Sequence, residues 1–200
     1  MKRHISLLFM LVAAVMLAGK PARADNETGR EEYEIPDHGT LIMDVPVEWQ
    51  ATFYKPEDDS FPIISFHPFK GPDTFQLSVG IFWSTDALRE LTDPHNLRRF
   101  VENVGQNILE QADQHSLDLE EVVGHSGIGY LFDLTDMDAG KDEYQYLTQG
   151  ALAVGNIVVV FSLFTREGQQ QKIRQETLKM LKNAKQDLSR RDVNYKPAVN

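Results

Sequence analysis

Gly124-His-Ser-Gly127 is a stretch whose residue types could do hydrolytic chemistry. A serine hydrolase of the nucleophile-elbow type carries Gly-x-Ser-x-Gly where a strand turns sharply into a helix. Here the fifth position is Ile128, and the segments on both sides of Ser126 have strand character. Gly127-x-Gly129 also lacks the third glycine of a dinucleotide-binding fingerprint. A turn between two strands is therefore favoured over a hydrolase that uses His125 or Ser126.

A second candidate is the acidic stretch from Asp133 to Glu143. Its carboxylates are those of Asp133, Asp136, Asp138, Asp142 and Glu143. They could hold calcium, but an EF-hand that starts at Asp136 needs a third ligand at 140, a glycine at 141 and a glutamate at 147. The chain has Gly140, Lys141 and Leu147 there. A solvated hairpin loop is favoured, as it is for Glu57-Asp58-Asp59, although whether the longer loop binds a cation stays open.

The histidines downstream of residue 24 show no spacing that is typical of a metal site. They are His38, His67, His95, His115 and His125. None belongs to an H-x-H or H-E-x-x-H pattern. His67 and His125 lie at the ends of expected strands and could converge with a carboxylate in three dimensions, but scattered surface histidines are favoured. We therefore assign no catalytic, cofactor-binding or metal-binding residue, and no cofactor.

Aromatic residues are dense between residues 53 and 83, where they could line a pocket for an apolar ligand. They are Phe53, Tyr54, Phe61, Phe66, Phe69, Phe75, Phe82 and Trp83. Aromatics at alternating strand positions are more often part of a core. If Phe82 and Trp83 flank one strand, at most one of them shares a given face.

The element that must organise these residues is a hairpin, 144–154 followed by 157–165. Both strands are rich in β-branched and aromatic residues, and Gly155-Asn156 between them suits a type II′ turn with positive φ at the glycine. Both faces of 157–165 are apolar, so the sheet must be covered on both sides. We therefore expect helices or loops on each face.

The other expected elements surround this hairpin. Asp93 and Pro94 mark the start of a helix that continues through Ala112, and a second helix runs from near Glu167 to Leu188. Gly105 within the first helix costs about 1 kcal/mol against alanine, which suggests close packing. Trp49 is expected as a core residue at a corner after Pro46. The expected strands cover 40–45, 51–54, 62–66, 75–83, 119–125 and 127–135, the first four in meander order.

The N-terminus has the pattern of a cleavable secretory signal. Two basic residues precede an apolar run at 5–18, and Ala22-Arg-Ala24 supplies small residues at the positions that a signal peptidase reads. The apolar run of about 14 residues would span roughly 21 Å as a helix, short of the roughly 30 Å hydrocarbon core, so cleavage after Ala24 is favoured over an anchor. The expected divisions are a signal at 1–24, a flexible stretch at 25–32, one domain at 33–188 and a flexible tail at 189–200.

Cysteine and charge narrow the class of protein further. The chain has no cysteine, which excludes disulfides, thiolate zinc sites, cysteine nucleophiles and a lipidated N-terminal cysteine. Removal of residues 1–24 leaves 16 of the 20 basic residues and all 30 acidic residues, a formal net charge of −14. Such a charge repels nucleic acid and anionic membranes. We expect neither nucleic-acid binding nor membrane insertion after cleavage.

Three features together resemble the PsbP-like superfamily, which includes the PsbP subunit of photosystem II and the envelope protein DcrB. They are Gly39-Thr-Leu-Ile-Met-Asp-Val-Pro46 followed by Trp49, then Gly127-Ile-Gly-Tyr-Leu-Phe132, then Gln149-Gly150 ahead of the hairpin. The resemblance spans about 33–188. It implies an α+β fold in which a central antiparallel, meander-like sheet of about six to seven strands is sandwiched by two main helices. It also implies an accessory or partner-binding role without catalysis.

Three functional hypotheses follow from the sequence. The first is an exported, acidic, non-catalytic protein of the bacterial cell envelope, periplasmic or secreted, that binds a protein partner of unknown identity. The second is a carrier of a small ligand or a metal ion such as calcium. The third is a hydrolase, which the sequence supports least.

Overall fold

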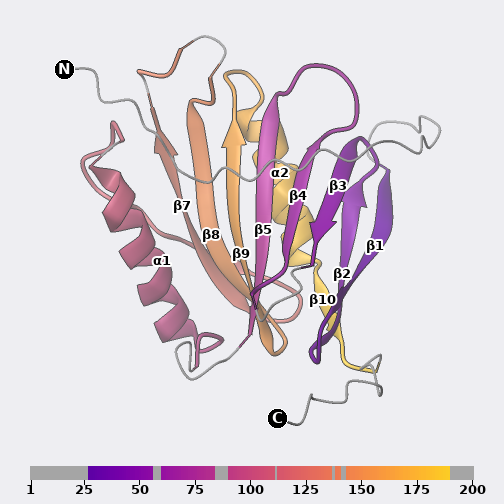
Figure 1. Ribbon diagram of the computed structural model, residues 1–200. Coiled ribbons are helices and arrows are strands. Elements are labelled where there is room, and N and C mark those ends of the chain that lie inside the picture. Colours follow the sequence, from indigo (N-terminus) through magenta and orange to yellow (C-terminus); the bar gives the residue numbers. More distant parts are fainter. Residues whose placement is uncertain are drawn as a thin grey trace.

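The computed structural model describes residues 27–55, 60–83, 90–110, 112–136, 138–140 and 143–189. These residues form strands and two helices, arranged as Figure 1 shows. The strands are β1 (Thr28–Ile35), β2 (Gly39–Pro46), β3 (Trp49–Tyr54), β4 (Ile63–Pro68), β5 (Phe75–Trp83), β6 (Glu120–Val123), β7 (Ile128–Thr135), β8 (Tyr146–Val154), β9 (Ile157–Thr165) and β10 (Lys185–Asp187). The helices are α1 (Pro94–Leu109) and α2 (Gln170–Lys182).

Two sheets make up the β structure. A seven-stranded antiparallel sheet has the order β3-β4-β5-β9-β8-β7-β6, and a three-stranded sheet has the order β1-β2-β10. The predicted hairpin, β8 and β9, lies inside the large sheet, and Gly155 has φ +63° in its turn. The expected α+β fold with a central antiparallel sheet and two helices is therefore confirmed.

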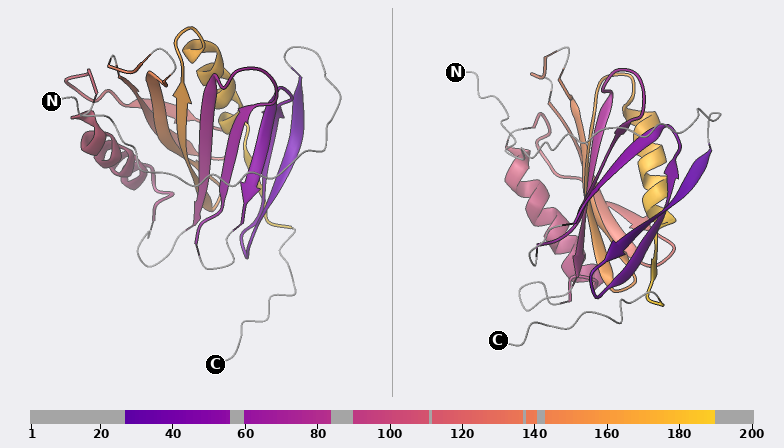
Figure 2. Two further views of the ribbon diagram at one scale, coloured as in Figure 1. Left: turned by 45° about the horizontal axis from the view of Figure 1, so that its top comes forward. Right: turned by 45° about the vertical axis from the view of Figure 1, so that its right-hand side comes forward.

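The two helices lie on opposite sides of the large sheet (Figure 2, right panel). α1 packs on β7 and β8, where Leu97 and Val101 meet Phe132 and Leu134. α2 and the three-stranded sheet cover the other side, where Met43 and Met180 join Leu77 and Phe161 in the larger core. The molecule therefore has three layers, with α1 alone in one outer layer.

Local signals in the sequence explain how α1 is fixed. The Asp93 carboxylate accepts hydrogen bonds from the backbone N–H groups of His95 and Asn96 at 3.0 and 3.1 Å, as expected of a helix N-cap. A Cβ at Gly105 would lie 2.6 Å from Leu117 Cδ2 and 3.0 Å from Phe132 Cε1. The close packing predicted at Gly105 is confirmed.

The structure corrects three sequence-based expectations about the elements. Residues 28–32, expected to be flexible, form the first part of β1, because Tyr33 and Ile35 are buried and their strand pairs fully with β2. The strand at 40–45 belongs to the small sheet rather than to a four-strand meander with 51–54, 62–66 and 75–83. The second helix ends at Lys182 instead of reaching Leu188, because Lys185–Asp187 pairs with β2.

Candidate functional site

Among the described residues, no helix covers one half of the large sheet on the side of α1. On β5 the residues Phe75, Leu77, Val79 and Ile81 are buried toward α2, so their alternate neighbours point to the side of α1. The same alternation applies on β3, β4 and β9. We call the resulting surface the open face, and its residues are Gln50, Thr52, Tyr54, Ile63, Ser65, His67, Gln76, Ser78 and Ser162. All nine are partly or fully exposed.

Strand register aligns the hydroxyl groups of the open face in one row. Thr52 pairs with Ser65, Ser65 with Ser78, and Ser78 with Ser162. Because neighbouring strands lie about 4.8 Å apart, the row extends roughly 14 Å across the sheet. Gln149 on β8 continues it up to the part of the sheet that α1 covers. The open face thus presents small hydrogen-bonding groups on a rigid surface.

Aromatic and aliphatic side chains border one end of the row. Tyr54 and Ile63 are 53% and 41% exposed. The ring centroids of Phe61 and Phe82 lie 4.6 Å apart, and the Phe82 ring covers Gly80, where a Cβ would lie 2.8 Å from a ring carbon. Tyr54 and Ile63 pair across β3 and β4, so these two exposed side chains lie next to each other.

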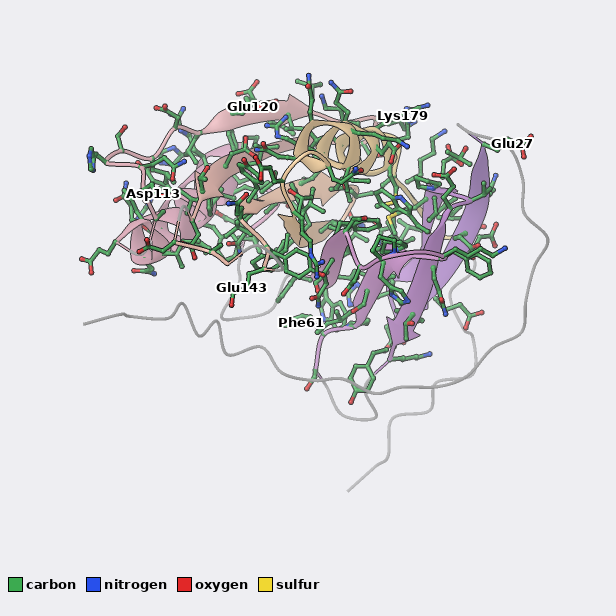
Figure 3. The ribbon with its side chains drawn as sticks, turned by 90° about the horizontal axis from the view of Figure 1, so that it is seen from above. Glu27, Phe61, Asp113, Glu120, Glu143 and Lys179 are labelled. Carbon is green, nitrogen blue, oxygen red and sulfur yellow. The ribbon has the colours of Figure 1, made fainter. Side chains whose placement is uncertain are left out.

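The open face, as defined by these nine residues, contains no aspartate, glutamate, lysine or arginine. By contrast, charges surround α2: Glu27, Asp44, Glu48, Glu176 and Lys179 line a groove of about 80 Å³ between α2 and the start of the small sheet. Figure 3 shows Lys179 and Phe61 on opposite sides of the large sheet. The molecule therefore separates a neutral surface from a charged one.

A second groove adjoins the open face where α1 ends. It holds about 70 Å³ and is lined mainly by Ile108, Leu134, Tyr144, Leu147 and Phe164. Burial, followed by the nearby Asp73 carboxylate, raises the pKa of the Tyr144 hydroxyl to about 12 despite the opposing charge of Arg166. This hydroxyl therefore stays neutral at physiological pH.

The two candidate hydrolase residues each bond to the chain near the end of α2. The backbone N–H of His125 donates to the Lys182 carbonyl at 2.7 Å, and the Ser126 hydroxyl donates to the Ala184 carbonyl at 3.4 Å. Ser126 lies in the turn between β6 and β7, as predicted, and His125 lies in the same turn because β6 ends at Val123 and does not reach residue 125. Gly127 lies where a Cβ would collide with the backbone of Ala153, so close strand packing explains this glycine.

The acidic stretch divides into separate local roles. Asp133 lies on β7 and faces Arg174 of α2, whose guanidinium also contacts Glu120 at 2.6 Å. The Asp136 carboxylate accepts from the Asp138 N–H, and the Glu143 carboxylate accepts from the Gly140 N–H. Asp142 lies outside the described residues, as does Glu57-Asp58-Asp59.

Histidines and acids do not gather into a metal site within the described residues. His67 lies on β4 and His125 follows β6, so β5, β9, β8 and β7 separate them. His38 instead stacks on Trp83, with ring centroids 4.5 Å apart.

Sequence reasoning missed the open face, because its hydroxyls come from four strands that only the register aligns.

Of the eight aromatic residues singled out in the sequence, Phe66 and Phe75 are in the core, and Phe53, Phe82 and Trp83 are partly buried against it. Phe66 and Phe75 are buried beside Trp49, which confirms the predicted position of Trp49. Phe82 and Trp83 point to opposite faces of β5, as expected, because they join different core clusters. Tyr54 is the one exposed member of this set, and Phe61 and Phe69 are half-buried.

Comparison with known proteins shows the fold. No family model and no curated protein matches the sequence. The solution structure of cyanobacterial PsbP (CyanoP) from Synechocystis sp. PCC 6803 is similar, with a TM-score of 0.51, 13% identity, and coverage of 84% of this chain and 98% of CyanoP. The chain therefore has a PsbP-like fold.

Two further solved structures are less similar. Protein PA94 of unknown function from Pseudomonas aeruginosa has a TM-score of 0.40 at 16% identity, over 66% of this chain and 96% of its own. A Bacteroides thetaiotaomicron protein has a TM-score of 0.41 at 13% identity, over 79% of this chain and 48% of its own.

Proposed function

We propose that this protein is an exported, non-catalytic accessory protein of the bacterial cell envelope that binds a protein partner through the open face. The observation that carries the proposal is the neutral row of hydroxyls beside exposed Tyr54 and Ile63, on a sheet surface without a helical cover. Interface centres are depleted of charge and enriched in aromatic residues. The open face shares the lack of charged residues, and Tyr54 supplies an exposed aromatic ring beside its hydroxyl row.

The chemistry of the open face defines the kind of partner. A flat surface of hydroxyl, amide and aromatic groups fits a neutral protein surface that supplies its own amides and hydroxyls. Nucleic acid and anionic lipid would need lysine or arginine, and the open face has neither. No helix in the described residues is long and apolar enough to cross a membrane. The secretory signal expected at 1–24 supports a location in the envelope.

A variant pair tests the proposal. The wild-type protein is used to capture partners from an envelope extract, in parallel with Ser78→Arg, which puts a cation in the middle of the hydroxyl row. Gln175→Arg is the matched control, because Gln175 is exposed on α2, away from the open face. We expect a protein that the wild type and Gln175→Arg enrich and Ser78→Arg does not.

The same experiment can contradict the proposal. If Ser78→Arg captures the same proteins as the wild type over several salt concentrations, the open face is not the binding surface. N-terminal sequencing of this protein, after expression with its full N-terminus, tests export separately. Cleavage after Ala24 gives a chain that begins with Asp25.

The carrier alternative has less support from the geometry. The two grooves hold about 70 and 80 Å³, whereas pockets for small ligands usually hold about 300–1,000 Å³. Thermal melts with calcium, manganese, zinc or lipids decide the question, because a ligand at 100 times its Kd adds about 2.7 kcal/mol to the free energy of unfolding. A shift with any of them would favour the carrier.

A further inference from the structure

The four strands at the edges of the two sheets differ in charge. β1 contains Arg30, Glu31, Glu32 and Glu34, β6 contains Glu120 and Glu121, and β10 has three residues that include Lys185 and Asp187. β3, with the sequence Trp-Gln-Ala-Thr-Phe-Tyr, has no charged residue. Natural edge strands usually carry charges that prevent pairing with another chain. β3 is therefore the unprotected edge among the described strands.

The N–H and C=O groups of alternate residues of β3 point away from β4, its one partner among the described strands. The Phe69 N–H donates to the Glu48 carbonyl at 2.7 Å, so residues 48 and 69 form a hydrogen-bonded pair. Along an antiparallel ladder such pairs alternate with pairs that share no hydrogen bond. Gln50, Thr52 and Tyr54 therefore bond to β4, and the N–H and C=O groups of Ala51 and Phe53 point outward. β2 does not take these groups: β1 pairs along one of its edges, β10 pairs with Thr40, Leu41 and Ile42 on the other, and β3 pairs only with β4 among the described strands.

We propose that β3 pairs edge to edge with β3 of a second copy of this chain, antiparallel, with Thr52 at the two-fold axis. This register places Ala51 of one copy opposite Phe53 of the other, where each outward N–H finds an outward carbonyl. The small alanine lies beside the large phenylalanine, and Thr52 lies beside Thr52. Cross-strand pairs of these kinds stabilise antiparallel sheets.

Charges at the ends of β3 favour a second copy over an unrelated strand. Glu48 precedes the strand and Lys55 follows it, and both are exposed. In this register Lys55 of each copy lies opposite Trp49 of the other, one residue from Glu48, so unlike charges come close to each other at both ends of the interface. Elsewhere the acidic chain, with a formal net charge of −10 over its full length, repels a second copy.

The dimer would join two large sheets into one continuous sheet. Because the axis is perpendicular to the sheet, the open faces of both copies lie on the same side. They would form one neutral surface of doubled width. The inference does not depend on the proposed function, since β3 can pair whether or not the open face binds a partner.

A cysteine at Thr52 tests the register. The chain has no cysteine of its own, so Thr52→Cys introduces the only thiol. Residue 52 would form a non-hydrogen-bonded pair with its symmetry mate, at a Cα separation of about 4.5 Å, which is within the roughly 4.4–6.8 Å range of disulfides. Gln175→Cys on α2 is the control. Under mild oxidation we expect a covalent dimer of Thr52→Cys and little of Gln175→Cys.

A proline at Ala51 tests the hydrogen bonds. Ala51→Pro removes an outward N–H and leaves every bond to β4, and proline is tolerated on sheet edges at such positions. By sedimentation equilibrium we expect the wild type at twice the monomer mass and Ala51→Pro at the monomer mass, with the same circular dichroism. Ala51→Ser, which keeps the N–H, should remain a dimer.

Three results would overturn the proposal. The first is a wild type that stays monomeric at all concentrations tested. The second is a dimer that persists in Ala51→Pro. The third is equal cross-linking of the two cysteine variants. Protection of the Ala51 and Phe53 amides from hydrogen exchange only after addition of an envelope extract would assign the edge to a foreign strand instead of a second copy.

Discussion

Two halves of the same sheet surface differ in how they are built. Under α1, the residues of β7 and β8 that point outward are apolar, with Phe132, Leu134 and Leu147 among them. Beyond α1, the equivalent positions are hydroxyls and amides such as Ser65, Gln76 and Ser78. The covered half contributes to the stability of the folded chain. The open half contributes little to that stability. Its surface is neutral, although charged residues at these positions would make the protein more soluble.

The largest expected effect is in the covered half. Phe132→Ala removes a ring that is 1% exposed and contacts α1, so we expect a loss of about 3–5 kcal/mol in the free energy of unfolding. Urea denaturation measures it. Ser78→Ala in the open half should change the same quantity by less than about 0.5 kcal/mol. Similar losses in both variants would remove the distinction between the halves.

A smaller loss is expected where α1 approaches the sheet most closely. Gly105→Val would force a side chain against Leu117 and Phe132, and overpacking of this kind costs about 1–3 kcal/mol. Gly29→Val on β1 is the control, because no atom lies within 4 Å of a Cβ there. A stable Gly105→Val with native α1 would show that the helix can move outward at little cost.

The open half can be tested by making it resemble the covered half. Replacing both Ser78 and Ser162 by valine raises strand propensity, so the free energy of unfolding should stay constant or rise by up to about 1 kcal/mol. Static light scattering should show that the variant self-associates more. A clear loss of stability would mean that these hydroxyls make contacts inside the isolated chain.

The smallest effect is expected in the charged groove beside α2. Burial raises the pKa of the Glu176 carboxyl, Lys172 and Lys179 oppose the shift, and Glu48 reinforces it. Because the folded-state pKa is above the unfolded value, ionisation of Glu176 lowers stability, and that loss is complete above the folded-state pKa. Glu176→Gln should therefore stabilise the protein at pH 7, by up to about 0.5 kcal/mol.

The pH dependence distinguishes this effect from a general one. The gain from Glu176→Gln should shrink as the pH falls through the folded-state pKa, and it should vanish below the unfolded value of about 4.3. Thermal melts from pH 3 to pH 8 measure it. Ser78→Ala, which changes no charge, should differ from the wild type by the same amount at every pH.

Local patterns in the sequence were sufficient for much of the fold. The hairpin of β8 and β9, the cap at Asp93 and the glycine at 105 each depend on residues that are close in sequence or on one helix face, and each was predicted. The small sheet was not, because Leu41 pairs with Gln186 across most of the chain. Residues 184–188 also continue the apolar period of α2, so the sequence pattern favoured a longer helix.

The open face was beyond sequence reasoning for a related reason. Its hydroxyls at Thr52, Ser65, Ser78 and Ser162 lie in four separate strands, and each alone is an ordinary strand residue. Only the pairing of β5 with β9 places the last two side by side. Strand β1 did have a local signal, since Tyr33 and Ile35 alternate with charged residues, but its acidic composition favoured a flexible stretch.

The pairing of early strands with late ones has a consequence for synthesis. β5 pairs with β9, and β2 pairs with β10, the last described strand of the chain, so in both cases the partner is synthesised much later. Gln186, the central residue of β10, also links two turns: its side chain accepts from the Asn156 N–H at 2.7 Å and donates to the His38 carbonyl at 2.8 Å. Contacts this distant in sequence slow folding. A nascent chain therefore cannot complete the large sheet before β9 has been made, nor the small sheet before β10 has been made.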